Sequence, residues 1–151
     1  MPSSTLKQDF PISATSVKHV RDCVRSFCVD LGFPSPIVDS APLIASELAT
    51  NAVRHAKGHA VRAEFTLVLT LSGGRLDIAV WDYHPSPCPP LSNLADIPPD
   101  AQHGRGLALV CLDAAGFTWT RTPTGKLVSA WIQVGEAPAR RRPQPTQAGL
   151  F

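Results

Sequence analysis

One stretch of the chain decides its fold, the run Ser46-Glu47-Leu48-Ala49-Thr50-Asn51-Ala52-Val53-Arg54-His55-Ala56. Together with Ile44, it places apolar residues at intervals of four, at positions 44, 48 and 52, which is the stripe of an amphipathic helix. Glu47 and Asn51 are also four residues apart, so they lie one above the other beside this stripe. We expect the helix to follow the turn Gly32–Pro36 and to run to about Lys57, with Gly58 ending it. Pro42 either lies near its start or kinks it.

A second helix is predicted before that turn. Its apolar residues recur at spacings of three and four, and they are Val17, Val20, Val24, Phe27 and Leu31. Thr15 or Ser16 can serve as its N-cap, and Gly32 is a typical stop. A short strand around Asp9–Ile12 is expected to open the domain.

The segment after the helices alternates with a period of two, which predicts strands. In Val61–Leu71 the odd-numbered residues form an apolar face, and Ser72-Gly73-Gly74 is a hairpin signal. The partner strand, Arg75–Trp81, has Leu76, Ile78 and Val80 on its inner face. By the same period, Asp82 continues that inner face just past the last apolar residue.

The rest of the chain holds a long loop, one helix and a final hairpin. Tyr83–His103 is rich in proline, and loops of this length in compact domains are functional lids or insertions. A helix is expected over Leu107–Ala115, and a hairpin over Phe117–Thr122 and Lys126–Val134. Strands and helices are thus partly segregated, which predicts an α+β fold: a two-layer sandwich with a mixed, mostly antiparallel sheet and helices on one face. We expect a flexible N-terminus (1–8), one domain (9–134) and a disordered Pro/Arg-rich tail (135–151).

Composition narrows the functional classes. Hydrophobic residues make up 44% and charged residues 17%, a globular balance. The net charge of +2 falls to about neutral without Arg140–Arg142, so the electrostatic footprint of a nucleic-acid-binding domain is missing. No signal peptide or membrane span is evident, and we expect a cytoplasmic protein with reduced cysteines. A metal site built from the four residues His84, Cys88, His103 and Cys111 lacks any standard zinc spacing.

Three short features carry candidate chemistry. The amide oxygen of Asn51 suits a Mg²⁺ ion, and Glu47 can accept a proton from an attacking hydroxyl or water, or orient that group. Alternatively, both residues simply belong to the solvent-exposed face of their helix. Asp82 on a core-facing position needs a partner such as the N6 amine of adenine; alternatively, it caps the following turn. Gly104-Arg105-Gly106 precedes a helix, where backbone N–H groups and a cation favour phosphate; alternatively, it is an ordinary loop-to-helix junction.

In this order, the features resemble the GHKL (Bergerat) ATPases: a helix with E-x-x-x-N-A, an inward Asp at a strand end, and a long lid ending in G-x-G-L before a helix. The Ser46–Ala56 stretch and the run Gly104-Arg105-Gly106-Leu107-Ala108-Leu109-Val110 look especially like those of bacterial anti-sigma-factor serine/threonine kinases. The resemblance spans roughly Phe10–Val134.

The resemblance implies a Bergerat-type sandwich with an ATP lid, and ATP and Mg²⁺ as cofactors. Glu47 would be the catalytic carboxylate and Asn51 the Mg²⁺ ligand. Asp82 would hold the adenine of the nucleotide, and Ser129 would help if it replaces a family threonine. The lid residues would also bind the nucleotide, and they are Gly104, Arg105, Gly106 and Leu107. The implied partners are a sigma factor and an anti-anti-sigma (STAS) protein whose serine or threonine accepts the phosphate, with homodimerisation left open.

The chain departs from the family pattern at two places. His84 stands where the wider superfamily has a glycine, although the anti-sigma branch often lacks it, and Gly125-Lys126-Leu127-Val128-Ser129 lacks the threonine that commonly follows the turn glycine. Two rival functions follow. One is a catalytically weak GHKL-fold binding module that sequesters a regulatory protein. The other is the catalytic domain of a histidine kinase, which requires a helical phospho-acceptor segment upstream, whereas about fifteen residues precede the first helix here.

Overall fold

A computed structural model describes residues 3–55, 63–84 and 114–135 of the chain. Within these ranges the chain forms two helices and five strands. In chain order they are β1 (Ser4–Pro11), α1 (Ala14–Asp30), α2 (Ser35–His55), β2 (Glu64–Ser72), β3 (Arg75–Asp82), β4 (Gly116–Thr122) and β5 (Gly125–Gln133).

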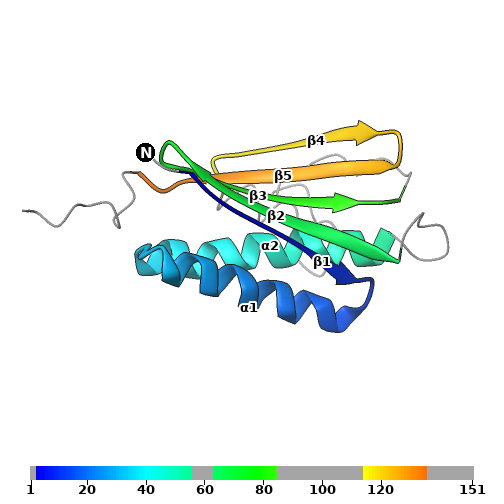
Figure 1. Ribbon diagram of the computed structural model, residues 1–151, viewed down its shortest axis with the longest axis horizontal. Coiled ribbons are helices and arrows are strands. Elements are labelled where there is room, and N and C mark those ends of the chain that lie inside the picture. Colours follow the sequence, from blue (N-terminus) through cyan, green and yellow to red (C-terminus); the bar gives the residue numbers. More distant parts are fainter. Residues whose placement is uncertain (1–2, 56–62, 85–113, 136–151) are drawn as a thin grey trace, which may run out of the picture.

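The five strands form one sheet in the order β1-β2-β3-β5-β4, and each neighbouring pair of these strands is antiparallel. Both helices lie along one side of this sheet, with α2 packed against its centre and against α1 (Figure 1). The expected α+β architecture, a two-layer sandwich with helices on one face of a mostly antiparallel sheet, is confirmed. In Figure 1 the C-terminal end of α2, the end of β3 and the start of β5 lie at the same end of the molecule.

The core lies between the sheet and the helices, because alternate residues of each central strand point into it. The faces predicted for β2 and β3 are confirmed: the apolar residues at positions 65, 67, 69 and 71 and at 76, 78 and 80 are all buried. From β5, Val128, Ala130 and Ile132 complete this inner face. Helix α2 contributes buried residues from two adjacent stripes, so it is covered by both the sheet and α1.

The helices follow their predicted stripes, with different boundaries in detail. Val20 and Val24 are fully buried in α1, and Gly32 adopts a φ of 73° just after its end, the left-handed conformation typical of a helix stop. The residue at the N-cap is Ser13 rather than Thr15 or Ser16. Ser16 lies inside the helix, where its hydroxyl donates to the Pro11 carbonyl at 2.6 Å.

The first strand is longer than the sequence pattern predicted. It begins at Ser4, not Asp9, so residues 4–8, which we expected to be flexible, pair with β2 through the register Ser4↔Leu71 to Pro11↔Glu64. This pairing satisfies backbone groups of a polar segment that has little apolar alternation of its own. The predicted loop Tyr83–His103 beyond His84, and the predicted helix Leu107–Ala115 up to residue 113, lie outside the described residues, as does the tail after residue 135. Neither α1 nor α2 has an apolar stretch that could cross a bilayer.

Candidate nucleotide site

Asp82 is the last residue of β3 and faces the helical layer. It continues the inner face formed by Leu76, Ile78 and Val80, and only 2% of its surface is exposed. One carboxylate oxygen, Oδ1, accepts the backbone N–H of His84 at 3.0 Å. Asp82 therefore caps the turn after the strand, which is one of the two roles expected of it. Its carboxylate also lies on the core-facing side, as the period of two predicts, and the role in holding adenine stays a prediction.

The charge partner of Asp82 is Lys126, a residue that sequence reasoning gave no role. The two residues face each other across the β3–β5 pair, and Lys126 Nζ lies 3.0 Å from Asp82 Oδ2. Their side chains are 2% and 3% exposed, so the ion pair is buried. Among the described residues the Nζ atom nonetheless has no hydrogen-bond partner, because the close approach lacks hydrogen-bond alignment. The site thus contains a buried ammonium with unused N–H groups.

Gly125 lets Lys126 reach this position. A Cβ on Gly125 would stand 2.0 Å from the Asp82 carbonyl oxygen and 2.8 Å from the Cα of Tyr83. No side chain fits there, so only glycine allows the start of β5 to lie so close to the end of β3. This close approach seats Lys126 directly opposite Asp82.

Glu47 and Asn51 lie in the C-terminal half of α2, beside the buried stripe of Ile44, Leu48 and Ala52. Both are partly exposed, and within the described part of the chain neither side chain has a hydrogen bond or ion pair. The hydroxyl of Thr50, by contrast, donates to the Ser46 carbonyl of its own helix at 2.7 Å. Helix α2 packs against β3, so the Glu47–Asn51 pair on α2 and Asp82 on β3 belong to facing layers of the sandwich.

Ser129 is not brought to the face that carries Asp82. In the β3–β5 register it pairs with Ala79, and it therefore projects to the side of the sheet away from the helices. The β5 residues that share a face with Asp82 are Lys126 and Val128. The expected phosphate-binding run, Gly104 to Leu107, lies outside the described residues.

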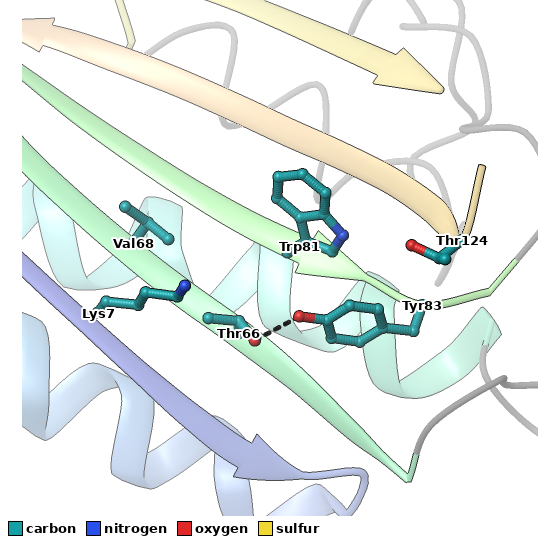
Figure 2. A pocket seen from close by; sticks show the side chains of 6 residues that line it. All are labelled: Lys7, Thr66, Val68, Trp81, Tyr83 and Thr124. Atoms are coloured by element: carbon teal, nitrogen blue, oxygen red, sulfur yellow. Dashed lines mark hydrogen bonds between the residues drawn. The ribbon is translucent and has the colours of Figure 1, made fainter. Parts of the chain in front are cut away.

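The outer face of the sheet holds a separate, half-open cavity of about 370 Å³, lined by Lys7, Thr66, Val68, Trp81, Tyr83 and Thr124 (Figure 2). Thr66 donates to Asp9 at 2.6 Å and lies 2.9 Å from the Tyr83 hydroxyl. None of the expected nucleotide-binding residues lines this cavity, and Asp82 points to the opposite side of the sheet. The cavity is therefore distinct from the candidate nucleotide site.

The remaining metal and cysteine expectations concern other parts of the fold. Among the described residues, no group of three or more His, Cys, Asp or Glu side chains could hold a metal ion. Cys88, His103 and Cys111 lie outside those residues. Cys23 and Cys28 are free thiols on α1, and burial raises the pKa of Cys28 to about 11.

A mostly antiparallel sheet covered by helices on one face is the fold of the GHKL class of ATP-binding domains. The family model of the histidine kinase-like ATPase domain matches residues 10–131. The chain therefore belongs to the histidine kinase-like ATPase family.

A solved structure that aligns with a TM-score of 0.63 shows the same fold. The RsbU and RsbW domains of Rv1364c from Mycobacterium tuberculosis align with a TM-score of 0.63 and 17% identity, over 88% of this chain and 33% of that one. The chain thus spans about a third of the length of that protein. The histidine kinase domain of the blue-light-activated kinase EL346 from Erythrobacter litoralis aligns with a TM-score of 0.48 and 20% identity, over 83% of this chain and 62% of that one. No curated protein matches the chain.

Proposed function

We propose that this domain is an ATP- and Mg²⁺-dependent serine/threonine protein kinase that regulates transcription by partner switching. In one state it would hold a sigma factor, and in another it would phosphorylate an anti-anti-sigma protein of the STAS type. The observation that carries the proposal is the buried carboxylate of Asp82 at the inner end of β3, in the layer facing the Glu47–Asn51 pair of α2. Membership of the histidine kinase-like ATPase family supports ATP as the nucleotide.

The residues present fit a purine nucleotide. The Asp82 carboxylate retains acceptor capacity beyond the His84 N–H, because its two oxygens offer about four lone-pair positions. It would accept a hydrogen bond from the exocyclic amine of adenine, while Val80 and Val128 on the same inner face offer apolar packing. Asn51 would give its amide oxygen to Mg²⁺, which neutralises charge on the phosphates when bound.

In the proposed phosphoryl transfer, Glu47 would act as the general base. Its carboxylate would take the proton from the acceptor hydroxyl as the bond from that oxygen to the γ-phosphorus forms. The bond from the γ-phosphorus to the oxygen that bridges it to the β-phosphate breaks, and ADP leaves with that electron pair. Arg105, with the backbone of Gly104 and Gly106, would contribute to charge neutralisation at the lid.

The mycobacterial structure with an RsbW domain supports the fold of the proposed kinase. At 17% identity that likeness concerns the fold alone. The specific acceptor and sigma factor therefore rest on the resemblance of the Ser46–Ala56 stretch to the anti-sigma kinases.

Two variants of α2 test the assignment. We expect Asn51→Ala to weaken Mg²⁺-ATP binding at least tenfold, measured by calorimetry. Glu47→Gln should keep binding within about threefold but reduce transfer of labelled phosphate to an acceptor by at least a hundredfold. Asp39→Ala, an exposed change near the start of the same helix, is the matched control and should alter neither quantity. Unchanged tight binding in Asn51→Ala would contradict the metal-ligand assignment.

A second candidate is a binding module with weak or lost catalysis. It is favoured by His84 in place of the superfamily glycine and by Lys126 beside the base-binding carboxylate. Incubation of the protein with Mg²⁺, labelled ATP and a panel of STAS proteins separates the two functions, since a binding module forms complexes but transfers no phosphate. Phosphoserine or phosphothreonine on an acceptor, absent with Glu47→Gln, supports the kinase.

A further inference from the structure

The Lys126 ammonium is a buried polar group on the same face as Asp82, and the proposed chemistry leaves it unused. It is 2% exposed, and it lies 3.0 Å from Asp82 Oδ2. Within the part of the chain that the structure describes, its Nζ has no accepting atom in hydrogen-bond geometry. A buried donor without an acceptor is costly, and more so when it is charged. An acceptor supplied by a ligand at this point would remove that cost.

Together the two side chains define what such a ligand must present. The carboxylate of Asp82 can only accept hydrogen bonds when ionised, and the ammonium of Lys126 can only donate them. Their charged atoms lie side by side on the inner face, one from β3 and one from β5. The complementary group is a planar edge that carries a donor next to an acceptor.

Adenine has this edge: the exocyclic amine at position 6 donates, and the adjacent ring nitrogen N1 accepts. We propose that Lys126 is a second base-recognition residue, which donates to N1 of adenine while Asp82 accepts from the N6 amine. This inference rests on the proposed nucleotide site.

The surrounding structure restricts where the Lys126 side chain can go. Its backbone is paired with β3 on one side and with Arg121 of β4 on the other. Gly125 fixes the close approach of the two strands, and Val128 is the next residue on the same face. The ammonium is therefore held beside Asp82, where a base bound to the carboxylate would lie within its reach.

The test compares ATP with 1-deaza-ATP, in which N1 is replaced by a C–H group and the N6 amine is kept. Binding to the full chain is measured by calorimetry in Mg²⁺. We expect wild type to bind 1-deaza-ATP at least tenfold more weakly than ATP, the loss typical of a hydrogen bond to a charged group. Lys126→Met should weaken ATP binding and bind the two nucleotides equally, whereas Lys126→Arg should keep a preference for ATP. Lys7→Met, on the outer face of the sheet, is the control and should discriminate as wild type does.

Each other outcome overturns a specific part of the inference. Equal binding of ATP and 1-deaza-ATP by wild type removes the role of Lys126 but leaves the nucleotide site in place, and this comparison needs no variant to fold. Wild-type discrimination that persists in Lys126→Met also removes it. If Lys126→Met weakens ATP and 1-deaza-ATP equally and wild type does not discriminate between them, the ammonium is assigned to a phosphate instead of the base. Tighter binding of GTP or CTP than ATP refutes adenine as the base. If none of these nucleotides binds, the proposed function fails together with the inference.

Discussion

Neutralising Asp82 while keeping its shape should destabilise the fold strongly. In Asp82→Asn the amide oxygen can still accept the His84 N–H, so the turn after β3 is preserved and the change isolates the charge. Lys126 then keeps a buried ammonium without its counter-ion at 3.0 Å. An effective dielectric of about 20 gives roughly 5–6 kcal/mol for the lost attraction, and breaking buried pairs costs about 3–5 kcal/mol in practice. We expect a loss of about 3–5 kcal/mol in the free energy of unfolding.

The double variant Asp82→Asn/Lys126→Met shows whether the loss belongs to the ion pair. Removing both charges eliminates the buried unpaired ion, so the double variant should recover most of the stability, to within about 1–2 kcal/mol of wild type. Urea unfolding followed by the fluorescence of the three tryptophans measures all four proteins. If the losses of Asp82→Asn and Lys126→Met simply add in the double variant, the two side chains are not coupled and the buried pair is refuted.

Other perturbations test the packing around the site and in α1. Gly125→Ala should lower the free energy of unfolding by at least about 2 kcal/mol, because its Cβ would meet the Asp82 carbonyl at 2.0 Å. Gly73→Ala is the control: its Cβ has open space and only the φ of 59° strains it, so the same urea assay should show a loss of about 1 kcal/mol. Equal losses in the two variants would contradict the close approach at Gly125. Iodoacetamide at pH 8 should label Cys23 far faster than Cys28, because Cys28 is 0% exposed and ionises only near its pKa of about 11. Equal labelling rates in peptide mass spectrometry would refute the burial of Cys28. The folded state raises the pKa of Cys28 from 9.0 and so favours the neutral thiol. The stability that this thiol contributes is therefore fully present below pH 9 and declines between pH 9 and about 11. Cys28→Ala should flatten that decline in unfolding measurements across this range, and an unchanged profile would contradict the assignment to Cys28.

The elements that could be predicted from the sequence are those with strong internal periodicity. The alternation of β2 and β3 and the stripes of α1 and α2 each follow from burial of one face, so local spacing was enough. The start of β1 could not be found this way. Residues 4–8 are mostly polar, and their strand conformation follows from pairing with β2, a contact between segments about 60 residues apart in the chain.

In the candidate site, too, some residues could be placed from local periodicity and others only from the pairing of distant strands. The inward direction of Asp82 follows from the period of β3, and the neighbourhood of Glu47 and Asn51 follows from the helical repeat. The partner of Asp82 depends on the β3–β5 register, which joins residues 44 positions apart (126 − 82) and has no local signal beyond the turn glycine. A lysine directly after Gly125, opposite an inward aspartate, could have been recognised only by aligning the two predicted hairpins as neighbours.

The register of β5 also explains why Ser129 cannot replace the family threonine beside Asp82. A shift by one residue would turn Ser129 inward, but it would also expose Val128, Ala130 and Ile132 and bring Leu127 and Trp131 into the core. The close contact at Gly125 opposes the same shift. The residue that faces the Asp82 carboxylate is thus coupled to the packing of the whole strand. Any gain or loss of nucleotide affinity at this position must therefore come from Lys126 itself, which is why substitution of that one side chain is the decisive experiment.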